Sequence, residues 1–185
     1  MSELPSDEAL MERYRDGDTA AFETLYTRHR GPLFRYLLRQ CERRAVAEEL
    51  YQDVWASVIR SREGYEVRAR FRTLLYRIAH NRLVDHYRAA NPARAAPGSD
   101  DGGPDTRPAP GPGPEELADR ARLATRVRER VAALPAEQRD VFLLHHEGGL
   151  SLEEIAEASG VGRETVKSRL RYALARLRRE LSEAP

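Results

Sequence analysis

The polar residues most suggestive of a specific chemistry lie close together in the segment GRETVKSRLR, at positions 162–171. An arginine can donate two hydrogen bonds to a guanine edge, a glutamate can accept one from cytosine, and threonine or lysine can hold phosphate oxygens. These residue types therefore suit a helix that lies in the major groove of DNA. The set consists of Arg163, Glu164, Thr165, Lys167, Ser168, Arg169 and Arg171.

The surrounding residues predict the element that would present this set. Ser151 and Glu154 are three positions apart, which is the pattern of a capping box at the start of a helix. Gly160 suits a turn that needs a left-handed backbone. The next helix then has an inner apolar stripe formed by Val166, Leu170, Leu174 and Leu177. Cap, turn, spacing and basic exterior agree, so they favour a helix-turn-helix over a plain helical hairpin with a charged outside.

A second polar stripe lies on the predicted helix FRTLLYRIAHNRLVDHYR, at positions 71–88. Its apolar residues recur at spacings of three and four and share one face: Phe71, Leu74, Leu75, Ile78 and Ala79. Another face carries Arg77, Asn81, Asp85 and Arg88, with His80 and Tyr87 beside it. Tyr76 also lies beside this stripe, where a core position and a surface position are both compatible with the spacing.

The distribution of charge is more informative than its sum, because the formal net charge is only +1. Arginines outnumber acidic residues between positions 60 and 88, and again between positions 163 and 179. Two basic regions on a nearly neutral chain predict two contact surfaces for an anionic partner. The alternative is a pair of solvated helix faces, and the charges alone do not decide between the two.

The chain of 185 residues is rich in helix formers and lacks β-branched runs, so we predict an all-α protein. Positions 91–116 hold seven of the eleven prolines and five of the twelve glycines, a composition that cannot build a core. We therefore predict two small helical domains. The N-terminal helical bundle spans residues 1–92 and the C-terminal helix-turn-helix domain spans residues 115–185. A flexible Pro/Gly-rich linker, residues 93–114, joins them and is expected to let them change their relative positions easily.

The N-terminal domain is predicted to contain four helices, of which the first begins at a capping Ser6. Gly31 and Pro32 mark a kink or a break in the second helix. The third helix, RAVAEELYQDVWASVIRS, has an apolar side that includes Leu50, Val54 and Trp55. Its other side carries Glu48, Glu49, Gln52 and Asp53, which suit either a solvated surface or a protein-binding face.

Several functional classes are disfavoured by what the sequence lacks. Cys41 is the only cysteine, which excludes a disulfide framework and a cysteine-rich zinc site. His145 and His146 are neighbours on a helix and point in different directions, so no metal site is predicted. No catalytic pair and no Gly-rich phosphate loop is found, so neither an enzyme nor a cofactor is expected. We recognise no signal peptide and no membrane-spanning stretch, and therefore expect a soluble, cytoplasmic protein without membrane insertion.

Three segments taken together resemble the bacterial extracytoplasmic-function (ECF) sigma factors, which give RNA polymerase its promoter specificity. AEELYQDVW is similar to the family's polymerase-binding segment. FRTLLYRIAHNRLVDHYR is similar to the segment that recognises and melts the −10 element. LPAEQRDVFLLHHEGGLSLEEIAEASGVGRETVKSRLRYALARLR is similar to the −35-binding domain. The segments follow the family's order and cover nearly the whole chain except the linker.

The resemblance implies a role for each candidate surface. Asn81 and Asp85 would contact base edges of the melted −10 DNA, and Arg77 and Arg88 its phosphates, with His80 and Tyr87 beside them. The residues between positions 163 and 171 would bind the double-stranded −35 element. Leu74 stands where many family members carry Trp, so the resemblance supplies no stacking group at that position.

The resemblance also implies the partners. Core RNA polymerase would bind through its clamp helices to Glu48, Glu49, Gln52 and Asp53. Promoter DNA is the second partner. An anti-sigma factor is a further candidate, since many relatives have one, and it would cover the clamp-binding face or hold the two domains together.

The main alternative is a stand-alone helix-turn-helix transcriptional regulator. Such a protein needs an effector or dimerisation domain, and the all-α N-terminal half supplies no recognisable one. Stoichiometry separates the two functions, because a regulator that reads a palindrome is a dimer, whereas a sigma factor joins core polymerase as one copy.

Overall fold

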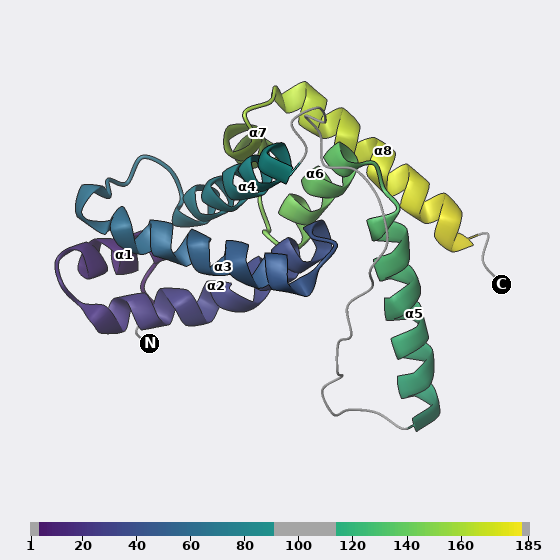
Figure 1. Ribbon diagram of the computed structural model, residues 1–185, viewed down its shortest axis with the longest axis horizontal. Coiled ribbons are helices and arrows are strands. Elements are labelled where there is room, and N and C mark those ends of the chain that lie inside the picture. Colours follow the sequence, from purple (N-terminus) through teal and green to yellow (C-terminus); the bar gives the residue numbers. More distant parts are fainter. Residues whose placement is uncertain (1–3, 91–113, 183–185) are drawn as a thin grey trace.

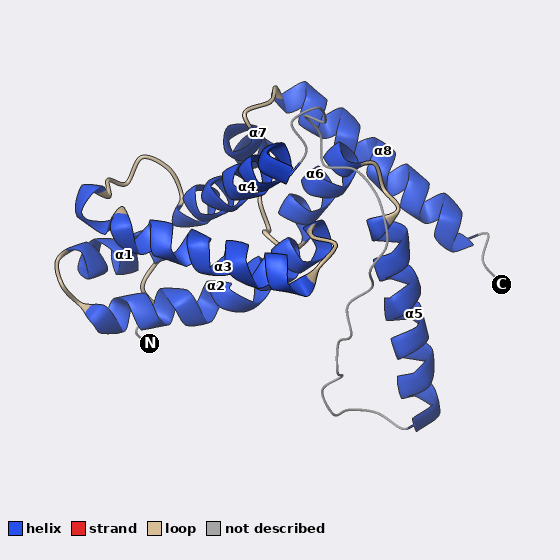
Figure 2. Cartoon of the chain, viewed as in Figure 1, coloured by secondary structure: helices blue, strands red, loops and turns tan. Residues whose placement is uncertain are grey.

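The computed structural model describes residues 4–90 and 114–182. In these residues the regular structure is entirely helical, as the ribbon in Figure 1 and the colouring in Figure 2 show. The prediction of an all-α protein is therefore confirmed. The predicted linker, residues 93–114, lies outside the described residues except for Pro114, at which the helix α5 begins.

The N-terminal half is a helical bundle formed by α1 (Asp7–Arg15), α2 (Thr19–Gln40), α3 (Arg44–Arg60), η1 (Arg62–Gly64) and α4 (Phe71–Ala90). The predicted cap of α1 is present, because the Ser6 hydroxyl accepts a hydrogen bond of 3.2 Å from the Ala9 N–H. α2 continues through Pro32 without a break. Leu25 before the proline and Leu33 and Leu37 after it are fully buried, and this packing stabilises the helix on both sides of Pro32.

Apolar side chains from all four helices fill the core of this bundle. Leu25, Leu37, Val54, Phe71 and Leu75 are fully or almost fully buried. Burial of each such side chain contributes about 1.5–3 kcal/mol relative to leaving it in water. The opposite faces of α3 and α4 remain at the surface, so the core packing determines which of their polar residues can meet a partner.

The C-terminal half consists of α5 (Pro114–Ala132), α6 (Ala136–His146), α7 (Leu152–Ser159) and α8 (Arg163–Ser182). α8 packs against α5, α6 and α7. Its buried Val166 and Ala173 belong to the same apolar cluster as Leu143, Leu144 and Ile155. α8 is therefore held along one side only, and its other side faces outward.

The two halves pack directly against each other. α4 lies along α7, and the C-terminal part of α2 meets α6 (Figure 1). A Cβ atom at Gly148 would lie 2.5 Å from the Leu144 carbonyl oxygen and 3.2 Å from the Tyr76 ring, so a side chain there would disturb this approach. The sequence led us to expect halves that a linker leaves free to move, whereas the helices of the two halves share a contact surface.

None of the described helices combines the length and the apolar character that crossing a membrane requires.

Candidate nucleic-acid interface

The helix-turn-helix forms as the sequence predicted. The Ser151 N–H donates to Glu154 Oε2 at 2.8 Å, and the Glu154 N–H donates to Ser151 Oγ at 3.2 Å, which completes the capping box of α7. Gly160 ends α7 with a φ of 69°, in the left-handed region that favours glycine. This turn places α8 directly after α7, with Val166 fully buried beneath it.

The polar residues predicted for α8 occupy its outward side, but not all of them are equally accessible. Arg163 pairs with Glu153 at 2.5 Å, and its hydrogen bond lowers the pKa of that glutamate. Arg169 pairs with Glu137 at 2.6 Å and leaves only 24% of its side chain exposed. The exposed members of the set are Arg163, Glu164, Thr165, Lys167 and Arg171, whereas Ser168 and Arg169 are half-buried. Most of this surface is thus open to a large partner such as duplex DNA.

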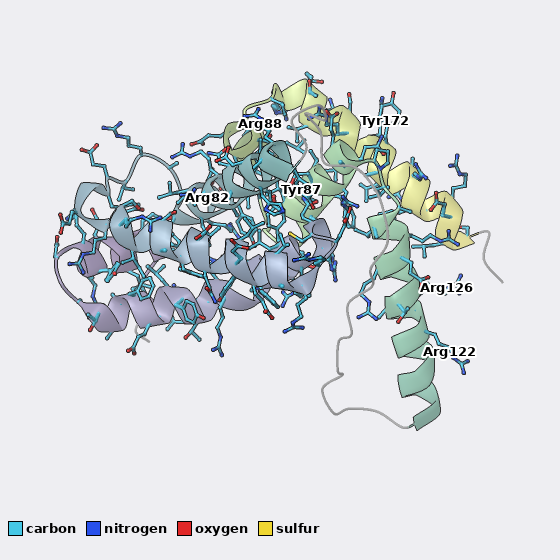
Figure 3. The ribbon with its side chains drawn as sticks, viewed as in Figure 1. Arg82, Tyr87, Arg88, Arg122, Arg126 and Tyr172 are labelled. Atoms are coloured by element: carbon cyan, nitrogen blue, oxygen red, sulfur yellow. The ribbon has the colours of Figure 1, made fainter. Side chains whose placement is uncertain are left out.

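Tyr172 is a surface aromatic residue that the sequence analysis missed. It is 55% exposed on α8 (Figure 3). The Arg171 guanidinium lies over its ring at 5.0 Å from the centroid. Its place outside the apolar spacing of Val166 and Leu170 was the signal that could have identified it. An exposed arginine stacked on an exposed aromatic ring suits contact with a nucleic-acid backbone or base.

The polar stripe of α4 divides into an exposed part and an engaged part. Asn81, Asp85 and Arg88 are exposed in the second half of the helix, and Figure 3 labels Arg88. Arg77 is also exposed, but its Nη1 lies 3.8 Å from Glu157 Oε1 of α7. Three members of the stripe are therefore accessible, and the fourth faces a carboxylate of the C-terminal half.

The aromatic neighbours of this stripe are less accessible than the sequence suggested. Tyr76 is 1% exposed and belongs to the core, which settles the alternative left open by its spacing. Tyr87 donates a hydrogen bond of 2.5 Å from its hydroxyl to the Gln40 carbonyl, and burial raises its pKa to about 12. His80 is half-buried, and its Nδ1 lies 3.0 Å from Asp140 Oδ2. In this arrangement the Tyr87 hydroxyl and His80 Nδ1 are both engaged within the protein.

Asp140 of α6 is buried in a pocket of donors that the N-terminal half supplies. Tyr36 donates from its hydroxyl to Asp140 Oδ1 at 2.8 Å, and Gln40 donates from Nε2 to the same oxygen at 2.7 Å. His80 reaches the other carboxylate oxygen. Burial and the Asp140 charge raise the pKa of Tyr36, while the pKa of His80 is lowered by burial but raised on balance by Asp140. We refer to Asp140, Tyr36, Gln40 and His80 as the Asp140 cluster.

Further charged pairs surround this cluster, with the acids on the C-terminal half. Glu147 accepts from Arg35 and Arg39, each at 2.8 Å, and its side chain is only 6% exposed. Glu154 accepts from the Thr73 hydroxyl at 3.2 Å and lies 3.7 Å from Arg70. Basic groups beside and on α4 are thus matched by carboxylates of α6, α7 and the turn between them.

The acidic face predicted on α3 is at the surface. Glu48, Glu49, Gln52 and Asp53 are exposed, while Leu50, Val54 and Trp55 are buried below them, as predicted. Beside this face lies an open hollow of about 530 Å³ between α2 and α3. Its lining includes Tyr26, Phe34 and Tyr51 as well as Glu48 and Gln52. An acidic rim next to an aromatic hollow suits a partner with basic and apolar side chains.

Metal and thiol chemistry receive no support from the described part of the chain. No group of three or more histidine, cysteine or acidic side chains there is placed to hold a metal ion. Burial raises the pKa of the Cys41 thiol to about 12, which keeps it protonated and unreactive.

Comparison with known protein families assigns both halves. Residues 25–92 match the family model described as Sigma-70 region 2, and residues 131–179 match the model described as Sigma-70, region 4. α3 and α4 lie within the first match, and α6, α7 and most of α8 lie within the second.

Individual proteins resemble the chain over most of its length. The RNA polymerase sigma factor CarQ of Myxococcus xanthus is 34% identical, over 94% of this chain and 96% of CarQ. The ECF RNA polymerase sigma factor RpoE of Cereibacter sphaeroides is 33% identical, over 94% of each chain. The sigma factor RpoE of Bartonella quintana, solved in complex with the anti-sigma factor NepR, has a similar fold, with a TM-score of 0.70 at 20% identity. That match covers 89% of this chain and 98% of the solved one.

Proposed function

Because the chain belongs to the ECF family of RNA polymerase sigma factors, we propose a specific division of labour among its exposed surfaces. The chain is an alternative sigma factor that binds core RNA polymerase and promoter DNA and initiates transcription, and its family consists of transcription initiation factors. In our proposal α3 holds the polymerase, α4 reads and helps to open the −10 element, and α8 reads the −35 element. A stand-alone regulator is not favoured, since region 2 and region 4 occur together in one chain.

One observation carries the assignment of α4. Asn81, Asp85 and Arg88 stand exposed along one side of a helix whose other side is locked into the core by Leu75, Ala79 and Leu83. An amide, a carboxylate and a guanidinium on a rigid support can meet unstacked bases and the backbone that carries them. The domains that we assign to these roles are residues 1–92 and 115–185, with residues 93–114 as the linker.

The packed arrangement is incompatible with simultaneous contact to both promoter elements. The −35 and −10 elements are centred about 25 base pairs apart, or about 85 Å along B-form DNA at 3.4 Å per base pair. α4 and α7, in contrast, touch each other. Arg77 and His80 also lie next to Glu157 and Asp140 of the C-terminal half. We therefore propose that the halves separate when the chain joins polymerase, and that the linker permits this separation.

An anti-sigma factor would favour the packed arrangement in this proposal. The Bartonella quintana relative was solved with such a partner, and its fold matches both halves of this chain. A partner that binds both halves at once would stabilise their contact and thereby hold the chain away from polymerase. Binding of core polymerase and of promoter DNA would place the protein in the bacterial cytoplasm, where the polymerase acts.

The proposal is tested with core polymerase reconstituted with the full chain, on a promoter that this holoenzyme selects from a random DNA library. The double variant Asn81→Ala with Asp85→Ala should bind core and the −35 element normally but fail to open the −10 element. A fluorescent base analogue in the −10 region reports opening, and a pre-melted template should restore transcription. The double variant Glu49→Arg with Asp53→Arg should instead lose core binding itself.

Two results would overturn the assignments. Normal opening by the α4 variant would remove the −10 element from α4. Normal core binding by the α3 variant would place the polymerase contact on another surface. Arg13→Gln on α1 serves as a matched control, because it changes one exposed charge on a helix that carries none of the assigned residues.

A further inference from the structure

Arg60 and Arg82 differ from the other arginines of the α3–α4 region in what they contact. Arg60 Nη2 donates to Ser57 Oγ at 3.0 Å, and Arg82 Nη2 donates to the same oxygen at 3.1 Å. Arg70 and Arg77, by comparison, each face a glutamate of the C-terminal half. Two guanidinium groups from two different helices therefore converge on one neutral hydroxyl.

This convergence leaves positive charge uncompensated. Within residues 4–90 and 114–182, neither Arg60 nor Arg82 forms an ion pair with a carboxylate. The nearest acids along the chain are Asp53, one turn before Ser57, Glu63, three positions after Arg60, and Asp85, three positions after Arg82. The Ser57 hydroxyl itself donates to the Asp53 carbonyl at 2.8 Å, so it offers the arginines only its lone pairs. Like charges held this close repel, and an anion between them would remove the repulsion.

The position of this group links the two surfaces assigned above. Arg82 follows Asn81 directly on α4 and lies toward α3 (Figure 3). Ser57 and Arg60 lie on α3, beyond the exposed Asp53 of the acidic face. A strand whose base meets Asn81 or Asp85 would therefore carry an adjacent phosphate past Arg82.

We propose that Ser57, Arg60 and Arg82 form a binding site for one phosphate of the melted −10 strand. The inference rests on the proposed role of α4 and adds a backbone contact that sits between base recognition and the polymerase face. A guanidinium fork matches the geometry of phosphate oxygens and can bind two of them at once. When the phosphate enters, both arginines turn from the Ser57 oxygen to the phosphate oxygens. The Ser57 hydroxyl remains beneath them as a small polar group.

The test measures the binding of reconstituted holoenzyme to a fluorescent single-stranded DNA library, randomised over the −10 region, at several salt concentrations. The double variant Arg60→Gln with Arg82→Gln should bind all sequences more weakly and enrich the same sequences as the parent protein. The slope of log affinity against log salt should fall by about 0.7, the value for loss of one phosphate contact on a single strand. Arg82→Lys keeps the charge and should retain most of the slope.

The controls separate this site from the rest of the proposal. Arg13→Gln should leave the slope unchanged, and circular dichroism should show the same helical content in every variant. If Asn81→Ala changes the enriched sequences while the double arginine variant leaves affinity and slope unchanged, the phosphate site is wrong and the role of α4 stands. If neither variant has an effect, both are wrong.

Two further outcomes would also refute the site. A slope that falls by about 1.4 would mean that each arginine binds its own phosphate, so the shared site does not exist. Weaker binding of the arginine variant to core polymerase without DNA would assign these residues to an acidic surface of the enzyme instead.

Discussion

The two ends of α4 differ in how their basic groups are compensated. Around its first half, Arg70, Arg77 and His80 each face a carboxylate of the C-terminal half. Toward its second half, Arg82 and Arg88 form no ion pair within the described residues. The first segment of α4 thus has basic groups that face acids of the other half, although the buried Arg72 Nε there has no hydrogen-bond partner. The second segment has arginines that are left for an external anion. The same contrast suggests that closure and DNA binding compete for the first segment only.

The largest effect on the contact between the halves is expected from replacing Asp140, the buried acid of the contact surface. Asp140→Ala would leave the fully buried Tyr36 hydroxyl and the Gln40 amide without their acceptor, and His80 without its counter-charge. Loss of one partner of a buried pair costs about 3–5 kcal/mol. We expect the halves to separate, which small-angle scattering would detect as a larger radius of gyration.

The matched control is Asp140→Asn, which keeps an oxygen for Tyr36 and Gln40 but removes the charge next to His80. It should open the halves less than Asp140→Ala. Because the donors to Asp140 side-chain oxygens belong to the other half, helical content should not change in either variant. An unchanged radius of gyration for Asp140→Ala would mean that the cluster does not hold the halves together.

A smaller effect is expected from replacing either of two tyrosines, whose hydroxyl groups donate to different parts of the protein. Tyr36→Phe removes a hydrogen bond between the halves, whereas Tyr87→Phe removes one within the N-terminal half. A hydrogen bond to a charged acceptor contributes about 1.5–3 kcal/mol and a neutral one about 0.5–1.5 kcal/mol. Tyr36→Phe should therefore favour separation of the halves, and Tyr87→Phe should lower the free energy of unfolding of the bundle alone.

Scattering and denaturant unfolding distinguish these two effects. Equal changes in the radius of gyration for both variants would contradict the assignment of Tyr36 to closure. Normal promoter opening by Tyr87→Phe is also expected, because the ring remains in place.

The local features of this fold were predictable because neighbouring residues determine them. The Ser6 cap, the Ser151–Glu154 capping box and the Gly160 turn each depend on residues within one helical turn. The buried and exposed faces of α3 followed from helical periodicity for the same reason. On α8 the predicted Val166 and Leu177 are buried, but Leu170 and Leu174 are only half-buried and Ala173 takes a buried place instead. Of the kink or break predicted at Gly31 and Pro32, the break does not occur, since packing of the neighbouring leucines outweighs the cost of a proline inside α2.

The contact between the halves was not predictable from local pattern. Asp140 lies in the segment EQRDVF, where nothing distinguishes it from a solvated acid, and its partner Tyr36 is about a hundred positions away. His80 and Tyr87 were assigned to the DNA-facing stripe because they lie beside it on a helical wheel. A wheel contains no information on which second element covers which side, so their partners Asp140 and Gln40 could not be foreseen.

The comparison extends to α8, where compensated and open arginines also occur. Arg169→Ala should weaken binding of the −35 duplex by about 1–3 kcal/mol and relax the preference at one base pair, if Arg169 leaves Glu137 to read a base. Glu137→Gln removes the same ion pair without touching the DNA-facing group, and should leave the preference unchanged. Duplex binding measured across single base-pair changes tests both. Identical profiles for the two variants would mean that Arg169 acts by holding α8 to α6.

The smallest expected effect is a pH dependence of closure that arises at His80. Burial lowers the pKa of His80, but the hydrogen bond to Asp140 and the charge of Asp140 together raise it by more. The net pKa in the packed form therefore lies above the ordinary value of 6.5. The cluster also contains Tyr36 and Gln40, and Arg139 donates from Nε to Gln40 Oε1 at 3.3 Å. Burial raises the pKa of Tyr36, so its hydroxyl keeps its proton near neutral pH.

A raised pKa means that the packed form binds the proton more tightly than the open form. The contribution of this proton to closure is therefore complete below about pH 6.5, the ordinary histidine value, and is lost as the pH rises through the raised pKa. Scattering between pH 6 and 8 should show the packed population decreasing as the pH rises. His80→Gln keeps a hydrogen-bond donor near Asp140 but cannot titrate, so its packed population should be constant over this range. A parent protein whose packed population increases as the pH rises would show that protonated His80 does not stabilise closure.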